Sequence, residues 1–160
     1  MKTLVVMSDT HGNVKGVESL LPIVLENSAC IHLGDGLGEL RPLLEENYRR
    51  LYFCRGNCDF YSGVEEEGVL DVEDLKIFYC HGHRYGVKTH LEGLAARAKS
   101  LDCQVALYGH THQARIDEMD GVTLVCPGTL KFPVGKGGSY AYLVVVGKKV
   151  TITIVGENPR

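Results

Sequence analysis

Residues 2–13 read KTLVVMSDTHGN, and this stretch contains both a predicted strand and the first candidate metal ligands. The apolar run at residues 4–7 is bounded by polar residues, which is typical of a strand buried on both faces. Asp9 and His11 follow at the strand end where α/β sheets bind ligands, and both are good ligands for a divalent metal. The pair alone leaves open that Asp9 caps the next helix and that His11 is an ordinary loop residue.

The length and composition are those of a globular protein. The chain has 160 residues, 44% hydrophobic and 23% charged, and we expect residues 1–160 to form a single domain. A net charge of -3 argues against general binding of nucleic acid. No apolar run reaches the ~20 residues that span a bilayer, and the N-terminus turns polar too soon for a signal peptide. We therefore expect a cytoplasmic protein with no membrane partner.

The first half of the chain alternates strand-like and helix-like segments. Three short apolar runs are expected to be strands: residues 4–7, 30–33 and 51–54. Apolar residues recur at helical spacing after Asn13, a plausible N-cap, and Pro22 is expected to end that helix or to start a second short turn. A second helix is expected over residues 37–48. Parallel βαβ units would bring the carboxyl ends of the three strands together at one edge of a sheet.

The second half changes to a β-rich pattern. The expected elements are strands at residues 69–70, 75–79 and 105–108, a helix over residues 87–98 and a solvated acidic turn at residues 65–67. Two hairpins are expected: residues 114–118 with 122–126, and residues 140–146 with 150–155. The simplest architecture is two sheets packed face to face with helices outside.

Seven possible metal ligands follow the predicted strands, each close to a glycine. They are Asp9, His11, Asp35, Asn57, His81, His110 and His112. Tight glycine turns can aim such side chains at a common point. Carboxylate, amide and imidazole ligands suit manganese, iron, nickel or zinc, and seven are too many for one tetrahedral ion. The set therefore predicts two ions that share a bridging carboxylate, an arrangement suited to phosphoryl transfer.

Five ordered blocks carry a resemblance to a known family. They are Asp9-x-His11, Gly34-Asp35, Gly56-Asn57-Cys58-Asp59, His81-Gly82-His83 and Gly109-His110-x-His112. In this order they resemble the calcineurin-like metallophosphoesterase superfamily. The short length and the Gly-Asn-Cys-Asp block are similar to its small prokaryotic branch, the YfcE-like phosphodiesterases. Residues 126–129 also resemble the Pro-Gly-Ser turn that commonly follows in this branch.

The resemblance implies an α/β fold, a four-layer αββα sandwich of two mixed β-sheets flanked by helices. The implied ligands are Asp9, His11 and His112 for one metal, Asn57, His81 and His110 for the second, and Asp35 as the bridge. A metal-bound hydroxide would attack phosphorus in line, while Asp59 would orient a ligand or the Asn57 loop. The expected cofactors are two divalent ions, manganese first, with nickel, iron or zinc as alternatives.

Cys58 stands where most members of the superfamily carry a histidine that is thought to donate a proton to the leaving oxygen. A thiol is a weak donor with a pKa of about 8.5, so diesters with good leaving groups are expected to be preferred. His83 is the alternative proton donor or phosphate contact, or else simply an exposed loop residue. Arg55 and Arg84 could bind a substrate phosphate or be surface charges. Most of the other cysteines are expected to be buried free thiols.

Three functions remain open from the sequence. The leading one is a metal-dependent phosphodiesterase acting on a small or exposed phosphodiester. A nuclease of the same superfamily is the second, although such nucleases usually have longer chains with added DNA-binding parts. The third is a non-enzymatic scaffold of the retromer-subunit type, whose site is degraded, whereas every inferred ligand type is intact here. The physiological substrate does not follow from the sequence, and edge strands could pair chains into a homo-oligomer.

Overall fold

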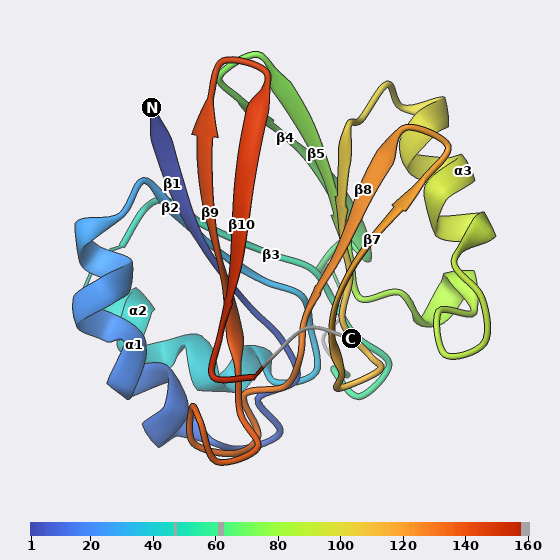
Figure 1. Cartoon of the computed structure of the whole chain (residues 1–160). Coiled ribbons are helices and arrows are strands. Elements are labelled where there is room, and N and C mark those ends of the chain that lie inside the picture. Colours follow the sequence, from blue (N-terminus) through green and yellow to red (C-terminus); the bar gives the residue numbers. More distant parts are fainter. Residues whose placement is uncertain (47, 61–62, 158–160) are drawn as a thin grey trace.

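The computed structural model describes residues 1–46, 48–60 and 63–157 and contains two five-stranded sheets (Figure 1). The first half of the chain forms β1 (Lys2–Met7), α1 (Val14–Glu26), β2 (Ala29–His32), the 3-10 helix η1 (Leu37–Leu40), α2 (Arg41–Glu45) and β3 (Leu51–Phe53). The second half begins with β4 (Glu67–Val72), β5 (Leu75–Cys80), the 3-10 helix η2 (His83–Tyr85), α3 (Glu92–Ser100) and β6 (Val105–Leu107). Two hairpins follow: β7 (Ala114–Met119) with β8 (Val122–Pro127), and β9 (Tyr140–Val146) with β10 (Lys149–Val155).

Both sheets are mixed, with parallel strands in the middle. The first has the order β10-β9-β1-β2-β3, in which β1, β2 and β3 are parallel and β9 pairs antiparallel with β1 and with β10. The second has the order β4-β5-β6-β8-β7, in which β5, β6 and β8 are parallel and the outer strands are antiparallel to their neighbours. Figure 1 shows the carboxyl ends of the parallel strands of both sheets at the end of the molecule opposite the N-terminus.

The core lies between the two sheets, and the helices lie outside them. Leu4 and Ile31 of the first sheet belong to one buried cluster with Ile77, Leu107 and Val125 of the second. Figure 1 shows α1 and α2 over the outer face of the first sheet and α3 over the outer face of the second. This four-layer αββα arrangement confirms the predicted fold class. Among the described residues, each helix is too short or too polar to cross a bilayer.

Strand β1 is buried on both faces, as its sequence predicts. Leu4 and Val6 point into the core between the sheets, whereas Val5 and Met7 belong to the cluster under α1. Successive side chains of a strand point to opposite faces, so a short apolar run can fill two layers of core at once. The loop that follows β1 therefore starts from a rigid support.

Helix α1 begins where the sequence predicts but does not end there. Asn13 is the N-cap, and its Oδ1 accepts a hydrogen bond from a first-turn amide at 3.1 Å. Pro22, however, lies inside the helix, on the exposed face, and the helix continues to Glu26. Val24 remains fully buried beyond the proline, so the packing of the apolar face outweighs one missing backbone hydrogen bond.

Two other predicted helices have different bounds. The one predicted over residues 37–48 is instead η1 followed by the short α2, with Pro42 in the first turn of α2; residue 47 lies outside the described residues. Proline has no N–H to donate, so it fits the first turn of a new helix better than the interior of a long one. The helix predicted over residues 87–98 begins only at Glu92. The chain first forms a turn after Gly86, whose φ is a left-handed 63°, and Thr89 N and His90 N both donate hydrogen bonds to Gly86 O.

Both hairpins are confirmed, but the acidic turn is not. Asp120 and Gly121 join β7 to β8 with φ angles of 52° and 79°, and Met119 pairs with Val122 across the turn. The turn predicted at residues 65–67 is wrong because Glu67 begins β4. The carboxylates of Glu66 and Glu67 bind arginine side chains 18 and 30 residues away, contacts that a local pattern could not reveal.

Candidate metal centre

Loops at one end of the two sheets carry the predicted ligands. The loops place Asp9 and His11 after β1, Asp35 after β2, Asn57 after β3, His81 after β5, and His110 and His112 after β6. Backbone hydrogen bonds join neighbouring loops, as when Asp9 N donates to Gly34 O (3.0 Å) and Gly109 N donates to His81 O (2.9 Å). Six of the seven predicted ligands come together in two groups of three.

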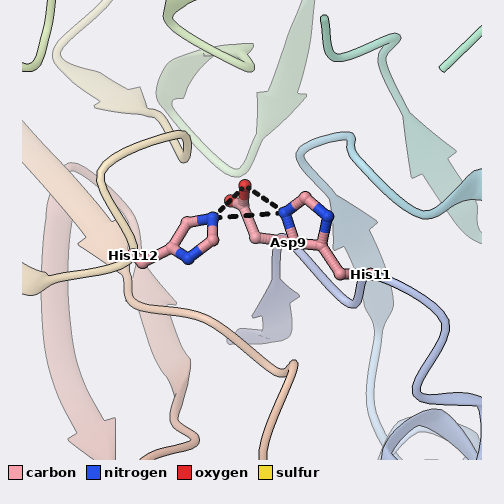
Figure 2. Close-up of side chains that lie close together, drawn as sticks. All are labelled: Asp9, His11 and His112. Atoms are coloured by element: carbon pink, nitrogen blue, oxygen red, sulfur yellow. Dashed lines mark hydrogen bonds and ion pairs between the residues drawn. The ribbon is translucent and has the colours of Figure 1, made fainter. Parts of the chain in front are cut away.

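The first group consists of Asp9, His11 and His112. Figure 2 shows the two imidazole rings directed at the Asp9 carboxylate from opposite sides. Asp9 Oδ1 lies 3.1 Å from His112 Nε2 and 3.5 Å from His11 Nε2, and the two Nε2 atoms are 3.2 Å apart. Asp9 Oδ1 is buried and makes no hydrogen bond in the described part of the chain. A divalent cation between these atoms would satisfy the buried oxygen and both nitrogens.

The second group consists of Asp35, His81 and His110. His81 Nε2 lies 3.2 Å from Asp35 Oδ2 and 3.1 Å from His110 Nδ1. The other ring nitrogen of His81 lies 2.8 Å from Leu33 O, a carbonyl that can only accept a hydrogen bond. A neutral His81 therefore carries its proton on Nδ1 and presents the lone pair of Nε2 to the group. These residues, too, fit a divalent metal.

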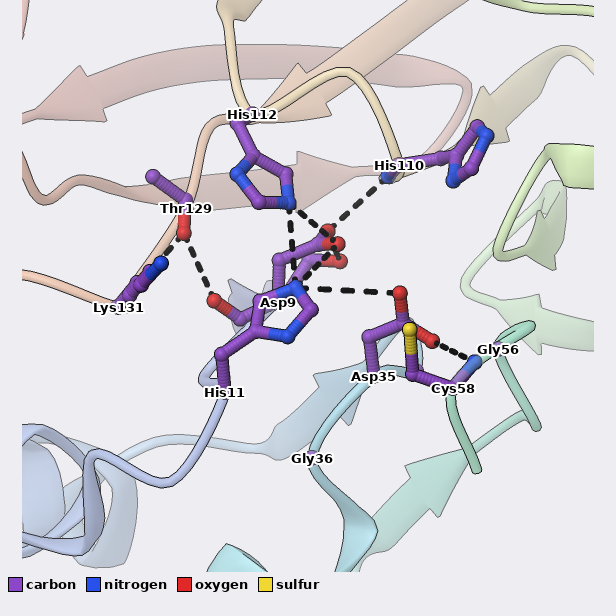
Figure 3. A network of polar contacts seen from close by, with 12 residues as sticks. Asp9, His11, Asp35, Gly36, Gly56, Cys58, His110, His112, Thr129 and Lys131 are labelled. Atoms are coloured by element: carbon purple, nitrogen blue, oxygen red, sulfur yellow. Dashed lines mark hydrogen bonds and ion pairs between the residues drawn. The ribbon is translucent and has the colours of Figure 1, made fainter. Parts of the chain in front are cut away.

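Asp35 belongs to the second group and also faces His11 of the first (Figure 3). Its Oδ2 is 3.2 Å from His81 of the second group and 3.8 Å from His11 of the first. Its other oxygen, Oδ1, accepts a hydrogen bond of 2.7 Å from the backbone N–H of Cys58. One carboxylate thus reaches toward both ligand sets, which is the position a bridging ligand requires.

The electrostatics of the centre keep its carboxylates ionised. Burial alone would raise the pKa of Asp35, but hydrogen bonds from His81 and from the Cys58 amide hold it well below the usual range. Burial opposes ionisation of Asp9 as well, and contacts with His112 and His81 outweigh it, so the pKa of Asp9 is lowered. For His110, burial and the neighbouring charge of His81 lower the pKa to about 4. Burial opposes protonation of His81, but its hydrogen bond with Asp35 and the charge of Asp9 raise its pKa. The ionised carboxylates and the neutral His110 are thus in the forms that bind metals.

Five residues of the centre have a left-handed backbone conformation. They are Asp9, His11, Asp35, His110 and His112, with φ angles of 54°, 40°, 59°, 70° and 60°. Residues other than glycine adopt this conformation rarely, because Cβ approaches a backbone carbonyl oxygen. Such strain is typical of functional sites, where the surrounding structure holds it in place. Here it turns each loop sharply so that its side chain points into the centre.

Asp59 holds two of the ligand loops together. Its Oδ2 accepts hydrogen bonds from Asp35 N (2.7 Å) and Gly56 N (2.8 Å), and its Oδ1 accepts one from Gly36 N (2.9 Å). The carboxylate is buried and connects the loop after β2 to the loop after β3. Its contacts are those of a group that orients the loops carrying Asp35 and Asn57, rather than one that faces the centre itself.

Asn57 and Cys58 lie exposed on the same loop. Asn57 Nδ2 is 3.5 Å from Cys58 Sγ, and among the described residues no hydrogen bond joins Asn57 to either histidine of the second group. The Cys58 sulfur lies close enough to His11 and Asp35 to form a third possible ligand set. Partial burial of the thiol and the charge of Asp35 both raise the pKa of Cys58. The other five cysteines are buried and free, as predicted.

His83 lies beside the second group. Its ring centre is 5.4 Å from that of His81 and 6.2 Å from that of His110. Its Nδ1 is buried and has no hydrogen-bond partner among the described residues. Burial and the charge of His81 lower the pKa of His83, so its ring is mostly neutral at pH 7. The prediction that it takes part in the site rests on this position.

Two polar residues behind the first group were not predicted to support it. Thr10 lies between two ligands, and its hydroxyl lies 3.1 Å from Nε2 of the fully buried His32 and donates to Glu39 Oε2 at 2.8 Å. Gly34 N donates to Nδ1 of His32 (3.1 Å), so the neutral ring carries its proton on Nε2 and donates it to Thr10. Burial lowers the pKa of His32 to about 4. The sequence feature that could have indicated this support is the position of His32 within an apolar strand.

The Asp9 loop is also fixed by neighbours. The hydroxyl of Ser8 donates to Asp9 Oδ2, which also accepts a hydrogen bond of 3.0 Å from His110 N. Thr129 Oγ1 donates to the backbone oxygen of Asp9 at 2.7 Å (Figure 3). Thr129 belongs to the turn at residues 126–129 that the family resemblance singled out, but its contact with this loop could not be read from the sequence.

A charged cluster forms part of the rim. Glu66 Oε1 lies 2.7 Å from Arg55 Nη2, and its Oε2 lies 2.7 Å from Arg84 Nε. Hydrogen bonds from Arg84 and Arg55 lower the pKa of Glu66 to about 2. Arg55 directly precedes the Asn57 loop and Arg84 directly follows His83, so Glu66 connects the two segments that carry these residues.

The fold and the two ligand groups define a class of protein. A family model described as the calcineurin-like phosphoesterase superfamily domain matches residues 1–148, and the chain belongs to this family. Its relatives are named metallophosphoesterases and phosphodiesterases, so a divalent metal and a phosphoric ester substrate are features of the family.

Individual relatives agree with this assignment. The chain is 30% identical to the probable metallophosphoesterase YsnB of Bacillus subtilis over 93% of this chain and 88% of that protein. It is 29% identical to the phosphodiesterase YfcE of Escherichia coli over 88% of this chain and 85% of that protein, which confirms the predicted branch. The structure of a predicted phosphoesterase from Streptococcus pneumoniae superposes with a TM-score of 0.82 at 28% identity, covering 96% of this chain and 88% of that one. Structures of Vps29 proteins, at 19–22% identity, share the fold alone.

Proposed function

We propose that this protein is a metal-dependent phosphodiesterase with a two-metal centre. The proposed ligands are Asp9, His11 and His112 for one ion, Asn57, His81 and His110 for the other, and Asp35 for both. The observation that carries the proposal is the arrangement around the two aspartates, where histidine nitrogens face one another 3.1–3.2 Å apart beside ionised, buried carboxylates. A divalent cation placed between these atoms would accept the nitrogen lone pairs and balance the charge of the carboxylates.

Divalent ions bound here would acidify water and neutralise charge on the phosphoryl oxygens. The chain's own residues prepare the centre for that chemistry. The hydrogen bond from His81 Nδ1 to Leu33 O fixes the tautomer that leaves Nε2 free to bind. The Asp59 carboxylate, which accepts backbone hydrogen bonds from both loops, sets the distance between Asp35 and Asn57. The exposed edge of the first group leaves room for a phosphodiester to approach from solvent.

Protonation of the leaving oxygen is the weak step of this centre. Cys58 has a raised thiol pKa and is a poor hydrogen-bond donor, while His83 has a lowered pKa and is mostly neutral at pH 7. Neither supplies a strong general acid near neutral pH. The enzyme therefore favours diesters whose leaving groups need little protonation.

The finer properties follow from the donor set and the shape of the site. Oxygen and nitrogen ligands without a required thiolate suit manganese first, with nickel, iron or zinc as alternatives. We place the reaction in the cytoplasm, on small or exposed phosphodiesters. The nuclease alternative is disfavoured because nucleic-acid-binding proteins usually have a basic surface, whereas this chain has a net charge of -3. The scaffold alternative is disfavoured because the chain retains every ligand type that a metal centre needs.

Metal removal tests the proposal directly. Exhaustive chelation should abolish hydrolysis of bis(p-nitrophenyl) phosphate, and Mn²⁺ or Ni²⁺ should restore it together with about two metal ions per chain by elemental analysis. Asp117→Asn is a matched control, because Asp117 binds Arg115 on the surface and lies outside the centre. Full activity after chelation, or no activity with any of the metals, would contradict the proposed function.

A further inference from the structure

Phe60 is the most exposed large apolar side chain in the described part of the chain, with an exposed fraction of 94%. It directly follows Asp59, the residue that joins two ligand loops. A ring left in water forgoes the free energy that burial of an aromatic side chain would provide. Isolated exposed apolar residues are common, so exposure alone would mean little. Its position beside the metal centre makes it informative.

Phe60 lines two hollows in the surface. The hollow toward the first group has a volume of about 430 Å³ and includes His11, Asp35 and Cys58 in its lining. The hollow toward the second group has a volume of about 660 Å³ and includes His83 and Arg84. Both volumes are in the range of small-molecule sites. The ring of Phe60 therefore borders the space that leads to the proposed ligands from either side.

The second hollow has charged side chains of both signs in its lining. Arg55 and Arg84 both line it, and Glu66 holds the two guanidinium groups at 2.7 Å. Asp59 and Glu66 line the hollow as well, so two carboxylates face two guanidinium groups there. The side chain of Arg84 remains 66% exposed, so it can contact a ligand while it stays paired with Glu66. A phosphate ester with a flat apolar part, whose phosphate lies at the metal centre, would meet both the exposed ring of Phe60 and the exposed guanidinium of Arg84.

We propose that Phe60 is a specificity-determining residue and that the substrates are nucleotidyl phosphodiesters whose base stacks on its ring. Nucleotides are phosphate esters that carry a flat aromatic group at a short distance from the phosphate, and stacking on an exposed aromatic side chain accepts any base. This inference rests on the proposed function, because it takes the phosphate to lie at the metal centre. The base then occupies the hollow beside Phe60, and Arg84 faces the remaining negative charge.

A lone tryptophan can report the stacking without any turnover. The chain has no tryptophan, so Phe60→Trp introduces a single indole at the proposed contact. The indole is excited at wavelengths that adenine does not absorb, and AMP should then quench its emission in a saturable manner. Ribose 5-phosphate, which has the same phosphate and sugar but no base, should not quench it. Phe53→Trp is the matched control, because Phe53 is 38% exposed on β3, outside both hollows. Saturable quenching confined to Trp at position 60 is the expected result.

Competition during hydrolysis tests the same contact in the unlabelled protein. Against bis(p-nitrophenyl) phosphate, AMP should inhibit the metal-loaded wild type at least about fivefold more strongly than ribose 5-phosphate, the lower end of base–aromatic stacking effects. Phe60→Ala should bring this ratio close to one, and Phe60→Tyr should restore it. The ratio compares two ligands of one variant, so a change in overall activity does not affect it.

The outcomes separate the inference from the proposed function. Metal-dependent hydrolysis with equal inhibition by AMP and ribose 5-phosphate would overturn the nucleotide assignment and leave the phosphodiesterase standing. Equal quenching at positions 53 and 60 would overturn it as well. If the emission of Trp at position 60 shifts with protein concentration alone, the ring lies in a contact between copies of the chain, and this result would overturn the proposal. Absence of hydrolysis with every metal would instead contradict the proposed function.

Discussion

The two ligand groups differ in how the protein surrounds them. In the second, the side chains of His81 and Asp35 are 0% and 3% exposed, and a ring nitrogen of His81 is fixed on a backbone carbonyl. In the first, the side chains of His11 and His112 are 25% and 39% exposed. The second group is thus built into the protein, whereas the first is completed at the surface, on the side from which a substrate and water arrive.

The support behind the groups differs in the same way. The first group depends on Asp9, which is fully buried and held by Ser8, Thr129 and a backbone amide, while its two histidines reach over it from loops. In the second group, the buried His81 is itself fixed by the hydrogen bond from its Nδ1 to Leu33 O. A centre of this kind separates a pre-formed metal position from one whose ligands can adjust, and its two halves should respond differently to substitution.

The largest effect is expected at Asp35, where the two groups meet. Asp35→Asn removes the negative charge that faces both groups, so it should lower metal content at both positions and reduce turnover by more than about 100-fold, beyond the usual cost of an outer partner. His112→Ala should lower metal content mainly at one position. Elemental analysis and bis(p-nitrophenyl) phosphate hydrolysis measure both, with circular dichroism as the check on folding. An Asp35→Asn protein with wild-type metal content would remove the bridging assignment.

The next effect concerns the support of the first group and depends on pH. In the folded protein the pKa of His32 is about 4, below the ordinary value of 6.5. Between these two pH values, His32 is protonated in the unfolded chain and remains neutral in the folded protein. Stability is therefore lost on acidification, by about 2 kcal/mol between pH 7 and pH 5 from this residue.

Urea unfolding of the chelated protein at pH 7 and pH 5 measures this loss. His32→Asn retains an acceptor for the Gly34 amide, and the variant should lose less stability between the two pH values than the wild type does. Equal losses in both proteins would show that His32 is not the group responsible.

The difference in exposure predicts a difference in chemical rescue. His112→Ala opens a gap at the surface that free imidazole can enter, so added imidazole should raise its activity by about tenfold, the scale of a recovered ligand contact. His81→Ala leaves its gap under the protein and should gain less than about twofold. Steady-state rates with and without imidazole make the comparison, with N-methylated imidazole of similar basicity as a second probe. Equal rescue of both variants would contradict the distinction between a built-in and a surface group.

An effect of similar size is expected at Cys58, next to the first group. Cys58→His introduces an imidazole able to protonate a leaving oxygen, and it should raise the rate on alkyl monoesters relative to aryl diesters by about tenfold, less than the 10² to 10⁴ of an optimised general acid. The dependence of rate on leaving-group pKa measures it, with Cys58→Asn as a control for size. Unchanged slopes and an unchanged monoester-to-diester ratio would leave His83 as the proton donor.

Much of the fold and the order of the ligand loops could be predicted from the sequence, because both depend on local patterns. The apolar run before Asp9 has to be a strand, and the Asp120-Gly121 pair has to be a hairpin turn. Parallel pairing of the first three strands then follows from the alternation of strands and helices. The convergence of the ligand loops is a consequence of that topology.

Other features depend on partners distant in sequence. Pro22 remains inside a helix because of packing beyond it, and Glu66 leaves its expected solvated turn because Arg84 and Arg55 reach it. The buried support from His32 has no spacing pattern of its own. The exposure of Phe60 was equally invisible, since a ring beside polar residues is as easily buried as exposed.

The left-handed backbone at five residues of the centre sets stability against function. Glycine tolerates this conformation without strain, so replacement of His11, with its φ of 40°, by glycine should give a chelated protein about 1 kcal/mol more stable than replacement by alanine, as measured by urea unfolding. The local backbone would relax while a ligand is lost. At these positions the proposed metal ligands are not the residues that the backbone prefers, so a chain released from the need for catalysis would gain stability by changing to glycine there, at the cost of the proposed centre.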